Sequence, residues 1–159
     1  MEKEQKNIIQ IYAVYLISII CNFIPSGAVS GLGSILFIII FIATYIYKAR
    51  AEEDSLTKNH MRYILKSIWI SSLLLIVGII AAYLFGDHSL IHQTMEGVKQ
   101  GMFLTEEQIN SLMMDYMMNN LLVFCTAFLP SLIYLFYRLA KGLVKAKENL
   151  HIENLKNWL

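Results

Sequence analysis

Thioether and imidazole side chains concentrate in one stretch of the 159-residue chain, between residues 86 and 120. Six of the eight methionines and two of the four histidines lie there: Met95, Met102, Met113, Met114, Met117, Met118, His88 and His92. Soft sulfur ligands favour Cu(I) outside the cytoplasm, whereas flexible methionine also suits the packing of a helical hairpin or contact with a partner. The spacing does not decide among these three roles, and we predict no metal or other cofactor.

Motifs of the common catalytic sites are absent from the sequence. It contains no nucleotide-binding glycine loop, nucleophile elbow, H-E-x-x-H or C-x-x-C pair. Its apolar runs contain no Asp or Glu, where an ion-coupled transporter usually places a carboxylate. We therefore predict no catalytic residues and a protein that is not an enzyme, with a lipid-modifying enzyme as the least favoured alternative. Cys21 and Cys125 are expected to be buried, reduced thiols.

Two cations and a set of small residues lie around the start of the third apolar run. Arg62 and Lys66 are spaced i, i+4, so they share a helix face suited to lipid phosphates. His60, Tyr63 and Ser67 share another face, and either Ser55 or Thr57 is placed to cap this helix. Further along the same predicted helix, four small residues share one face, which would let another helix pack closely against it: Ser67, Ser71, Gly78 and Ala82. The second apolar run also begins with small residues that would let another helix approach closely: Gly31, Gly33 and Ser34.

An amphipathic helix is predicted after Thr105. The sequence Thr105-Glu106-Glu107-Gln108 forms a capping box at its start. Its apolar residues repeat at i, i+3, i+4, i+7 and i+8: Ile109, Leu112, Met113, Tyr116 and Met117. We expect protein to cover this stripe, either the chain's own segment Leu90–Met102 or a binding partner. The helix is expected to continue without a break into the fourth apolar run, so that it stands upright.

Four apolar runs must position these groups, at residues 8–24, 29–47, 64–85 and 121–139. The chain is 57% hydrophobic and 16% charged, against about 45–50% and about 25% in soluble domains. About 20 helical residues cross a bilayer core roughly 30 Å thick. The fold class expected is a single all-α membrane domain with four transmembrane helices. We also expect an outer helical hairpin within residues 86–120 and an amphipathic cytoplasmic tail at residues 141–159.

The distribution of cations predicts the orientation of this domain. Twelve of the thirteen Lys and Arg residues lie in the N-terminal segment, around the connection between the second and third runs, or near the C-terminal end. Residues 86–120 contain only Lys99. By the positive-inside rule, both termini face the cytoplasm of a bacterial inner membrane. The formal net charge of +1 gives no indication of nucleic-acid binding.

The run His60-Met61-Arg62-Tyr63-Ile64-Leu65-Lys66-Ser67-Ile68-Trp69 has the pattern H-x-R-Y-x-x-K-S-x-W. It resembles a signature of small four-span bacterial inner-membrane proteins in the Tic20-like group of domains of unknown function. The resemblance extends over roughly Ile11 to Tyr83 and implies a membrane topology but no reaction. The long segment 86–120 departs from the short connections of that group.

These patterns favour an accessory or regulatory subunit of a larger inner-membrane complex, acting without catalysis. Its expected partners are membrane lipid and either another inner-membrane protein or a second copy of the chain. Two alternatives stay open. One is a small transporter or oligomeric channel lined by the Ser, Gly and Asn faces. The other is an immunity-type protein that binds a toxin through residues 86–120.

Overall fold

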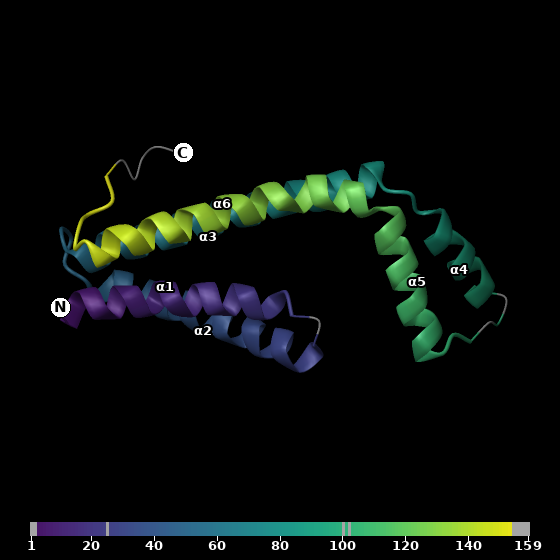
Figure 1. Ribbon diagram of the computed structural model, residues 1–159, viewed down its shortest axis with the longest axis horizontal. Helices are drawn as coiled ribbons and strands as arrows, with labels where there is room; N and C mark the ends of the chain where they lie inside the picture. Colours follow the sequence, from purple (N-terminus) through teal and green to yellow (C-terminus); the bar gives the residue numbers. More distant parts are fainter. Residues whose placement is uncertain (1–2, 25, 100, 102, 154–159) are drawn as a thin grey trace. The chain divides into compact units, whose positions relative to one another are not determined.

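The structure is a computed structural model that describes residues 3–24, 26–99, 101 and 103–153. These residues form helices and no strand, which confirms the all-α prediction (Figure 1). The helices are α1 (Lys3–Asn22), α2 (Gly27–Arg50), α3 (Leu56–Phe85), α4 (Ser89–Lys99), α5 (Glu106–Asn119) and α6 (Leu121–Lys147).

Three of the described helices, α2, α3 and α6, are long and apolar enough to cross a membrane. The predicted count of four spans is therefore corrected to three candidates. The first apolar run, residues 8–24, falls largely in α1, which also contains Gln5, Asn7 and Gln10 and is less apolar than the other three. Polar atoms in hydrocarbon need partners. Accordingly, α1 buries Gln5 and Ser18 against protein.

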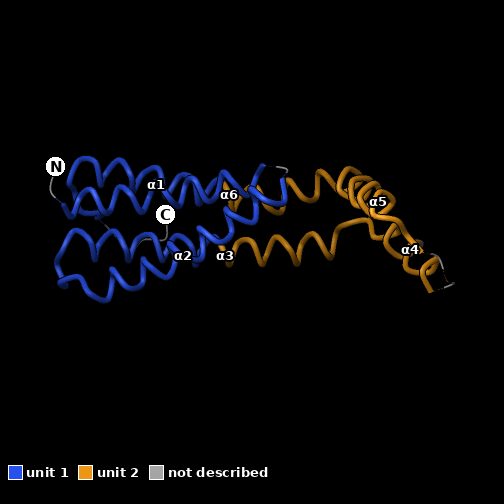
Figure 2. The backbone as a smooth tube through the Cα atoms, turned by 90° about the horizontal axis from the view of Figure 1, so that it is seen from below, with its two compact units in different colours: residues 1–71, 133–159 blue, residues 72–132 orange. Residues whose placement is uncertain are grey.

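Two compact units divide the chain (Figure 2). Unit 1 contains residues 1–71 and 133–159, and unit 2 contains residues 72–132. In unit 1, α1 and α2 form an antiparallel hairpin (Figure 1). A Cβ atom at Gly33 would lie 2.8 Å from the Cys21 Cβ and 2.9 Å from the Ser18 carbonyl oxygen, whereas Gly31 faces open space. Close packing at the start of the second run is thus confirmed for Gly33 and not for Gly31.

The core of unit 1 is a cluster of isoleucine, leucine and tyrosine side chains from α1, α3 and α6. Its fully buried members include Ile8, Tyr12, Tyr15, Met61, Tyr63, Ile64 and Leu139. Gly142 on α6 lets the Tyr12 ring approach, because a Cβ atom there would lie 2.3 Å from the Tyr12 hydroxyl oxygen. Both cysteines are free thiols, as expected, but neither is buried as predicted, since Cys21 is half-buried and Cys125 is exposed.

In unit 2, the parts of α3 and α6 that belong to it approach each other at Gly78. A Cβ atom at Gly78 would lie 2.4 Å from the Ala127 carbonyl oxygen. The following α4 and α5 lie side by side (Figure 1). The predicted capping box of α5 is confirmed: the Thr105 hydroxyl accepts from the Gln108 backbone, and the Gln108 side chain accepts from the Thr105 backbone.

The predicted unbroken helix from Thr105 into the fourth run is wrong, because α5 ends at Asn119 and α6 begins at Leu121. Between them, Asn120 leaves the helical conformation, with φ −103° and ψ 14°. Its buried side chain accepts from the Asp87 backbone nitrogen at 2.6 Å and donates to the Asp87 and Tyr116 carbonyls at 3.0 Å. These three bonds fix a joint between the two helices.

Within the predicted C-terminal tail, residues 141–159, the described residues are helical only as far as Lys147. α6 ends at Lys147, Asn149 takes a left-handed conformation with φ 58°, and the Leu150 nitrogen donates to the Lys145 carbonyl at 3.0 Å. This pattern is typical of a Schellman helix stop. The chain then returns to α3, where Asn59 exchanges two hydrogen bonds with the backbone of Ile152. Residues 154–159 lie outside the described residues.

Candidate functional site

An arginine on α6 lies inside unit 1, with its guanidinium among aromatic rings. Arg138 is 4% exposed, and its Nε donates to the Ser67 hydroxyl at 3.2 Å. Its guanidinium carbon lies 3.9 Å from the centroid of the Tyr63 ring and 5.8 Å from that of Tyr134. We call Arg138, Ser67, Tyr63 and Tyr134 the arginine cluster.

Two short helical repeats build this cluster. Tyr63 and Ser67 are four residues apart on α3, and the Ser67 hydroxyl donates to the Tyr63 carbonyl at 2.8 Å. Tyr134 and Arg138 have the same spacing on α6. Residues at this spacing share one helix face, so each helix contributes one tyrosine and one polar side chain to the same place.

The hydrogen-bonding capacity of the arginine cluster is incompletely used. The Arg138 Nη2 atom and the hydroxyls of Tyr63 and Tyr134 are buried and lack a hydrogen-bond partner. Within the described part of the chain, no carboxylate forms an ion pair with Arg138. A cation–π contact contributes about 2 kcal/mol when desolvated, whereas withdrawing a charge from water costs several kcal/mol. The cluster therefore contains one guanidinium nitrogen and two hydroxyls whose hydrogen-bonding capacity is unused.

A second polar network ties the ends of three helices of unit 1 together. The His60 Nε2 lies 3.1 Å from the Leu150 carbonyl, which can only accept, and the His60 Nδ1 lies 3.1 Å from the Tyr12 hydroxyl. The neutral imidazole therefore donates from Nε2 and accepts from Tyr12 at Nδ1. Gln5 donates to the last carbonyls of α6, those of Ala146 and Lys147. Glu4 accepts from the Thr57 nitrogen at 2.8 Å at the start of α3.

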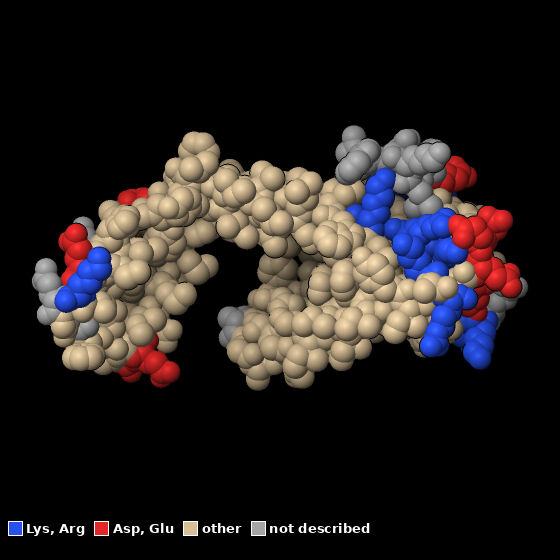
Figure 3. Space-filling model, turned by 180° about the vertical axis from the view of Figure 1, so that it is seen from behind, with Lys and Arg blue, Asp and Glu red and all other residues tan. Residues whose placement is uncertain are grey.

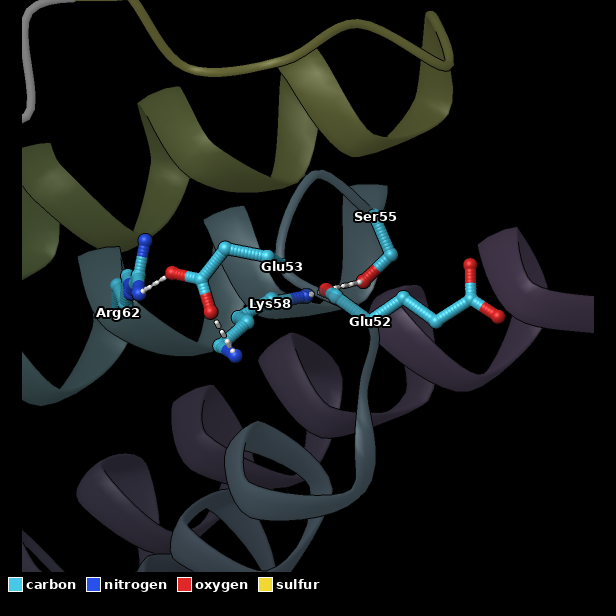
Figure 4. A network of polar contacts seen from close by, with 5 residues as sticks. All are labelled: Glu52, Glu53, Ser55, Lys58 and Arg62. Carbon is cyan, nitrogen blue, oxygen red and sulfur yellow. Dashed lines mark hydrogen bonds and ion pairs between the residues drawn. The ribbon is translucent and has the colours of Figure 1, made fainter.

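Charged side chains gather at this end of unit 1 (Figure 3). The Glu53 carboxylate bridges Lys58 and Arg62, and the Ser55 hydroxyl accepts from the Lys58 nitrogen at 3.2 Å (Figure 4). The last bond confirms Ser55 as the cap of α3. The hydrogen bonds from Lys58 and Arg62 lower the pKa of the Glu53 carboxyl. Arg62, predicted to bind lipid phosphate, is thus held by Glu53, while Lys66 is half-buried.

The predicted packing residues are divided between the two units. Ser67 and Ser71 are buried in unit 1. Ala82 is buried in unit 2, where Gly78 lies against the Ala127 backbone. The predicted common face of His60, Tyr63 and Ser67 is confirmed, because all three side chains are buried.

The chain itself covers only part of the stripe predicted to bind a partner. Leu112 and Tyr116 are half-buried, and the Tyr116 hydroxyl lies 2.9 Å from the His88 Nδ1. Ile109, Met113 and Met117 are exposed. Within the described residues, no group of three or more His, Cys, Asp or Glu side chains is placed to hold a metal ion.

Sequence reasoning missed the burial of Arg138, which it counted only as one of the cytoplasmic cations. A signal was present, since Ser131, Tyr134 and Arg138 are spaced i, i+3 and i+7 and so share a face of α6. Ser131 is buried with Arg138. Gln5 was also missed, because its role depends on carbonyls more than 140 positions away in sequence.

Comparisons of the chain with protein-family models, with curated proteins and with solved structures find no match. The resemblance of residues 60–69 to the Tic20-like group stays a prediction.

Proposed function

We propose that this protein is a non-enzymatic accessory subunit of a larger membrane complex, and that an acidic side chain of the partner completes the arginine cluster. The observation that carries the proposal is Arg138, a buried cation without a counter-charge among the described residues. An ionisable residue inside a membrane helix is costly unless it is paired, and such residues mark functional sites.

A carboxylate on a partner helix would satisfy this cluster once the side chains that enclose it move aside, because the unpartnered atoms are buried within the chain. It would accept from the free Nη2 of Arg138 and from the hydroxyls of Tyr63 and Tyr134, which lack partners. Ile133 and Tyr137 are four residues apart on α6 and well exposed, so they offer an apolar surface for the partner helix beside the face that holds Arg138. Charge-assisted hydrogen bonds are roughly twice as strong as neutral ones.

We further propose that the complex lies in a bacterial inner membrane with both termini on the cytoplasmic face, which requires that α1 cross the membrane together with the three candidate spans α2, α3 and α6. Gln5 and Glu4 support this orientation, because they tie the start of α1 to the end of α6 and to the start of α3. Lys and Arg side chains gather at the same end of unit 1 (Figure 3), in agreement with the positive-inside rule.

Purification of the tagged full chain from its own membranes in lipid nanodiscs tests the partner. Arg138→Met removes the charge and keeps an unbranched side chain, while Arg50→Met removes an exposed cation at the end of α2 and serves as the control. One unlike membrane protein should be recovered in a fixed ratio with the wild type and with Arg50→Met, and lost with Arg138→Met. Equal recovery with Arg138→Met, or recovery of the chain alone, refutes the proposal.

A charge exchange shows whether the contact is direct. Arg138→Glu should abolish recovery of the partner. Combining it with an acid-to-Arg change at the partner's intramembrane carboxylate should restore recovery. A partner without an acidic residue in its membrane helices contradicts the pairing.

A further inference from the structure

Two helices of unit 2, α4 and α5, present apolar side chains that this chain leaves uncovered. On α5 these are Ile109, Met113, Met114, Met117 and Met118, the four methionines being 55% to 63% exposed. On α4 they are Ile91, Met95 and Val98. We propose that α4 and α5 lie on the membrane surface and that lipid covers this face. The proposal goes beyond the partner at Arg138 and does not depend on it.

The joint at Asn120 makes this arrangement possible. A helix continuous with α6 would stand away from the bilayer, where lipid could not cover its apolar stripe. Instead, within unit 2, α5 runs across the direction of residues 121–132, the first part of α6 (Figure 1). Because α6 is a candidate membrane span, a helix that leaves its end at a steep angle lies along the membrane surface.

Several contacts hold this turn in place. Asn120 binds both backbone groups of Asp87. The His88 ring stacks on Tyr116, and its Nε2 lies 2.7 Å from the Tyr83 carbonyl at the end of α3. Gly86 gives the backbone room, since a Cβ atom there would lie 2.5 Å from the Ala82 carbonyl oxygen and 3.2 Å from the Asn120 Oδ1. The orientation of α5 is thus fixed by the fold of unit 2.

The uncovered face continues the apolar surface of the membrane helices. Leu121 and Leu122 at the start of α6 are exposed, as are Leu84 and Phe85 at the end of α3. Between residues 108 and 137, the single charged residue is Asp115. It is two positions from both Met113 and Met117, so it points to roughly the opposite side of α5. Glu106 and Glu107, in the first turn of α5, lie seven positions before Met113 and Met114 and so on the same side as these methionines. Only the second half of α5, from Met113 to Met118, therefore has a lipid-compatible side and a water-compatible side.

The charge of this segment indicates how lipid holds it. Residues 86–120 contain five acids and one lysine: Asp87, Glu96, Glu106, Glu107, Asp115 and Lys99. Such a segment gains nothing from anionic headgroups, which attract basic residues. Attachment must come from the burial of apolar side chains at the boundary between headgroups and acyl chains. Binding should therefore not depend on anionic lipid.

Spin labels on the full chain in liposomes distinguish lipid from water and from protein. Both native cysteines are replaced by serine, and Met113→Cys, Met117→Cys and Asp115→Cys each carry a label. Leu122→Cys, on the exposed surface of α6, gives the value for hydrocarbon. We expect the ratio of accessibility to oxygen over a water-soluble nickel complex to be severalfold higher at positions 113 and 117 than at 115. This ratio should be the same in zwitterionic and in anionic vesicles.

The other outcomes overturn the proposal. High nickel accessibility at all three positions on α5 means that the helix stands in water. Low accessibility to both reagents at 113 and 117 means that protein covers the face, and loss of that protection on dilution with lipid identifies a second copy as the cover. A ratio that rises only in anionic vesicles means that headgroup charge, rather than apolar burial, attaches the segment.

Discussion

Replacement of Gly78 by alanine tests the close approach of α3 and α6 in unit 2. The added Cβ would lie 2.4 Å from the Ala127 carbonyl oxygen and 3.0 Å from its carbonyl carbon, whereas ordinary contact begins at 3.4 Å. The opposing atoms belong to the backbone, so the two helices must separate by about 1 Å, the difference between 3.4 and 2.4 Å. Overpacking of this kind costs about 1–3 kcal/mol of unfolding free energy.

Gly31→Ala is the matched control, because its Cβ meets nothing within 4 Å. Both substitutions gain the same helix propensity, roughly 0.8–1.0 kcal/mol. The difference between the two variants therefore isolates the packing term and should be about 1–3 kcal/mol. Unfolding of both variants in mixed detergent micelles, followed by circular dichroism, measures this difference. Equal unfolding free energies would show that α3 and α6 are not in contact at Gly78.

Arg138→Met in the isolated chain should leave the unfolding free energy unchanged or raise it by up to about 4 kcal/mol, because replacing a buried charge by an apolar side chain is often stabilising. A loss of about 3 kcal/mol or more would show that Arg138 stabilises the fold instead. Asn120→Ala should release the joint, so that spin labels on α5 and α6 report a wider range of distances than in the wild type. The pKa of the Glu53 carboxyl is lower in the folded chain than in the unfolded chain. Its ion pairs therefore stabilise the folded chain at a pH above the unfolded-state pKa, and this stabilisation is lost as the pH falls through the folded-state pKa. Glu53→Gln should remove this part of the acid dependence of the unfolding free energy. Alkaline phosphatase fused after residue 100 should be active and after residue 55 inactive, the reverse result contradicting the proposed orientation.

The all-helical fold and most helix positions were predictable from sequence, because they depend on local features. The apolar runs, the capping box at Thr105 and the cap at Ser55 are each encoded within a few residues. The common face of His60, Tyr63 and Ser67 follows from helical spacing alone. These features require no knowledge of what each helix packs against.

The joint at Asn120 could not be predicted in the same way. The apolar repeat of α5 leads into the apolar run of α6, and only the pair Asn119-Asn120 interrupts it. What ends α5 is the bonding of Asn120 to Asp87, which lies 33 positions earlier. This long-range contact changes the inferred function of the segment, because an upright helix needs a protein cover and a helix along the surface does not.

The arginine cluster shows the same limit. Positive charge near the end of a span is expected from topology alone, so Arg138 resembled the other cytoplasmic cations. Its burial depends on the approach of α3, where Ser67 and Tyr63 receive it. The sequence contains the spacing of these residues on each helix but not the contact between the helices.

The mass of the native assembly, measured on particles extracted with their own lipids, tests the accessory-subunit proposal most directly. We predict a complex that contains this chain and an unlike membrane protein in fixed stoichiometry, and that Arg138→Met releases the chain from it. A mass equal to one copy of the chain, or to a whole number of copies, would contradict the proposal, and a ring of copies would favour the channel alternative.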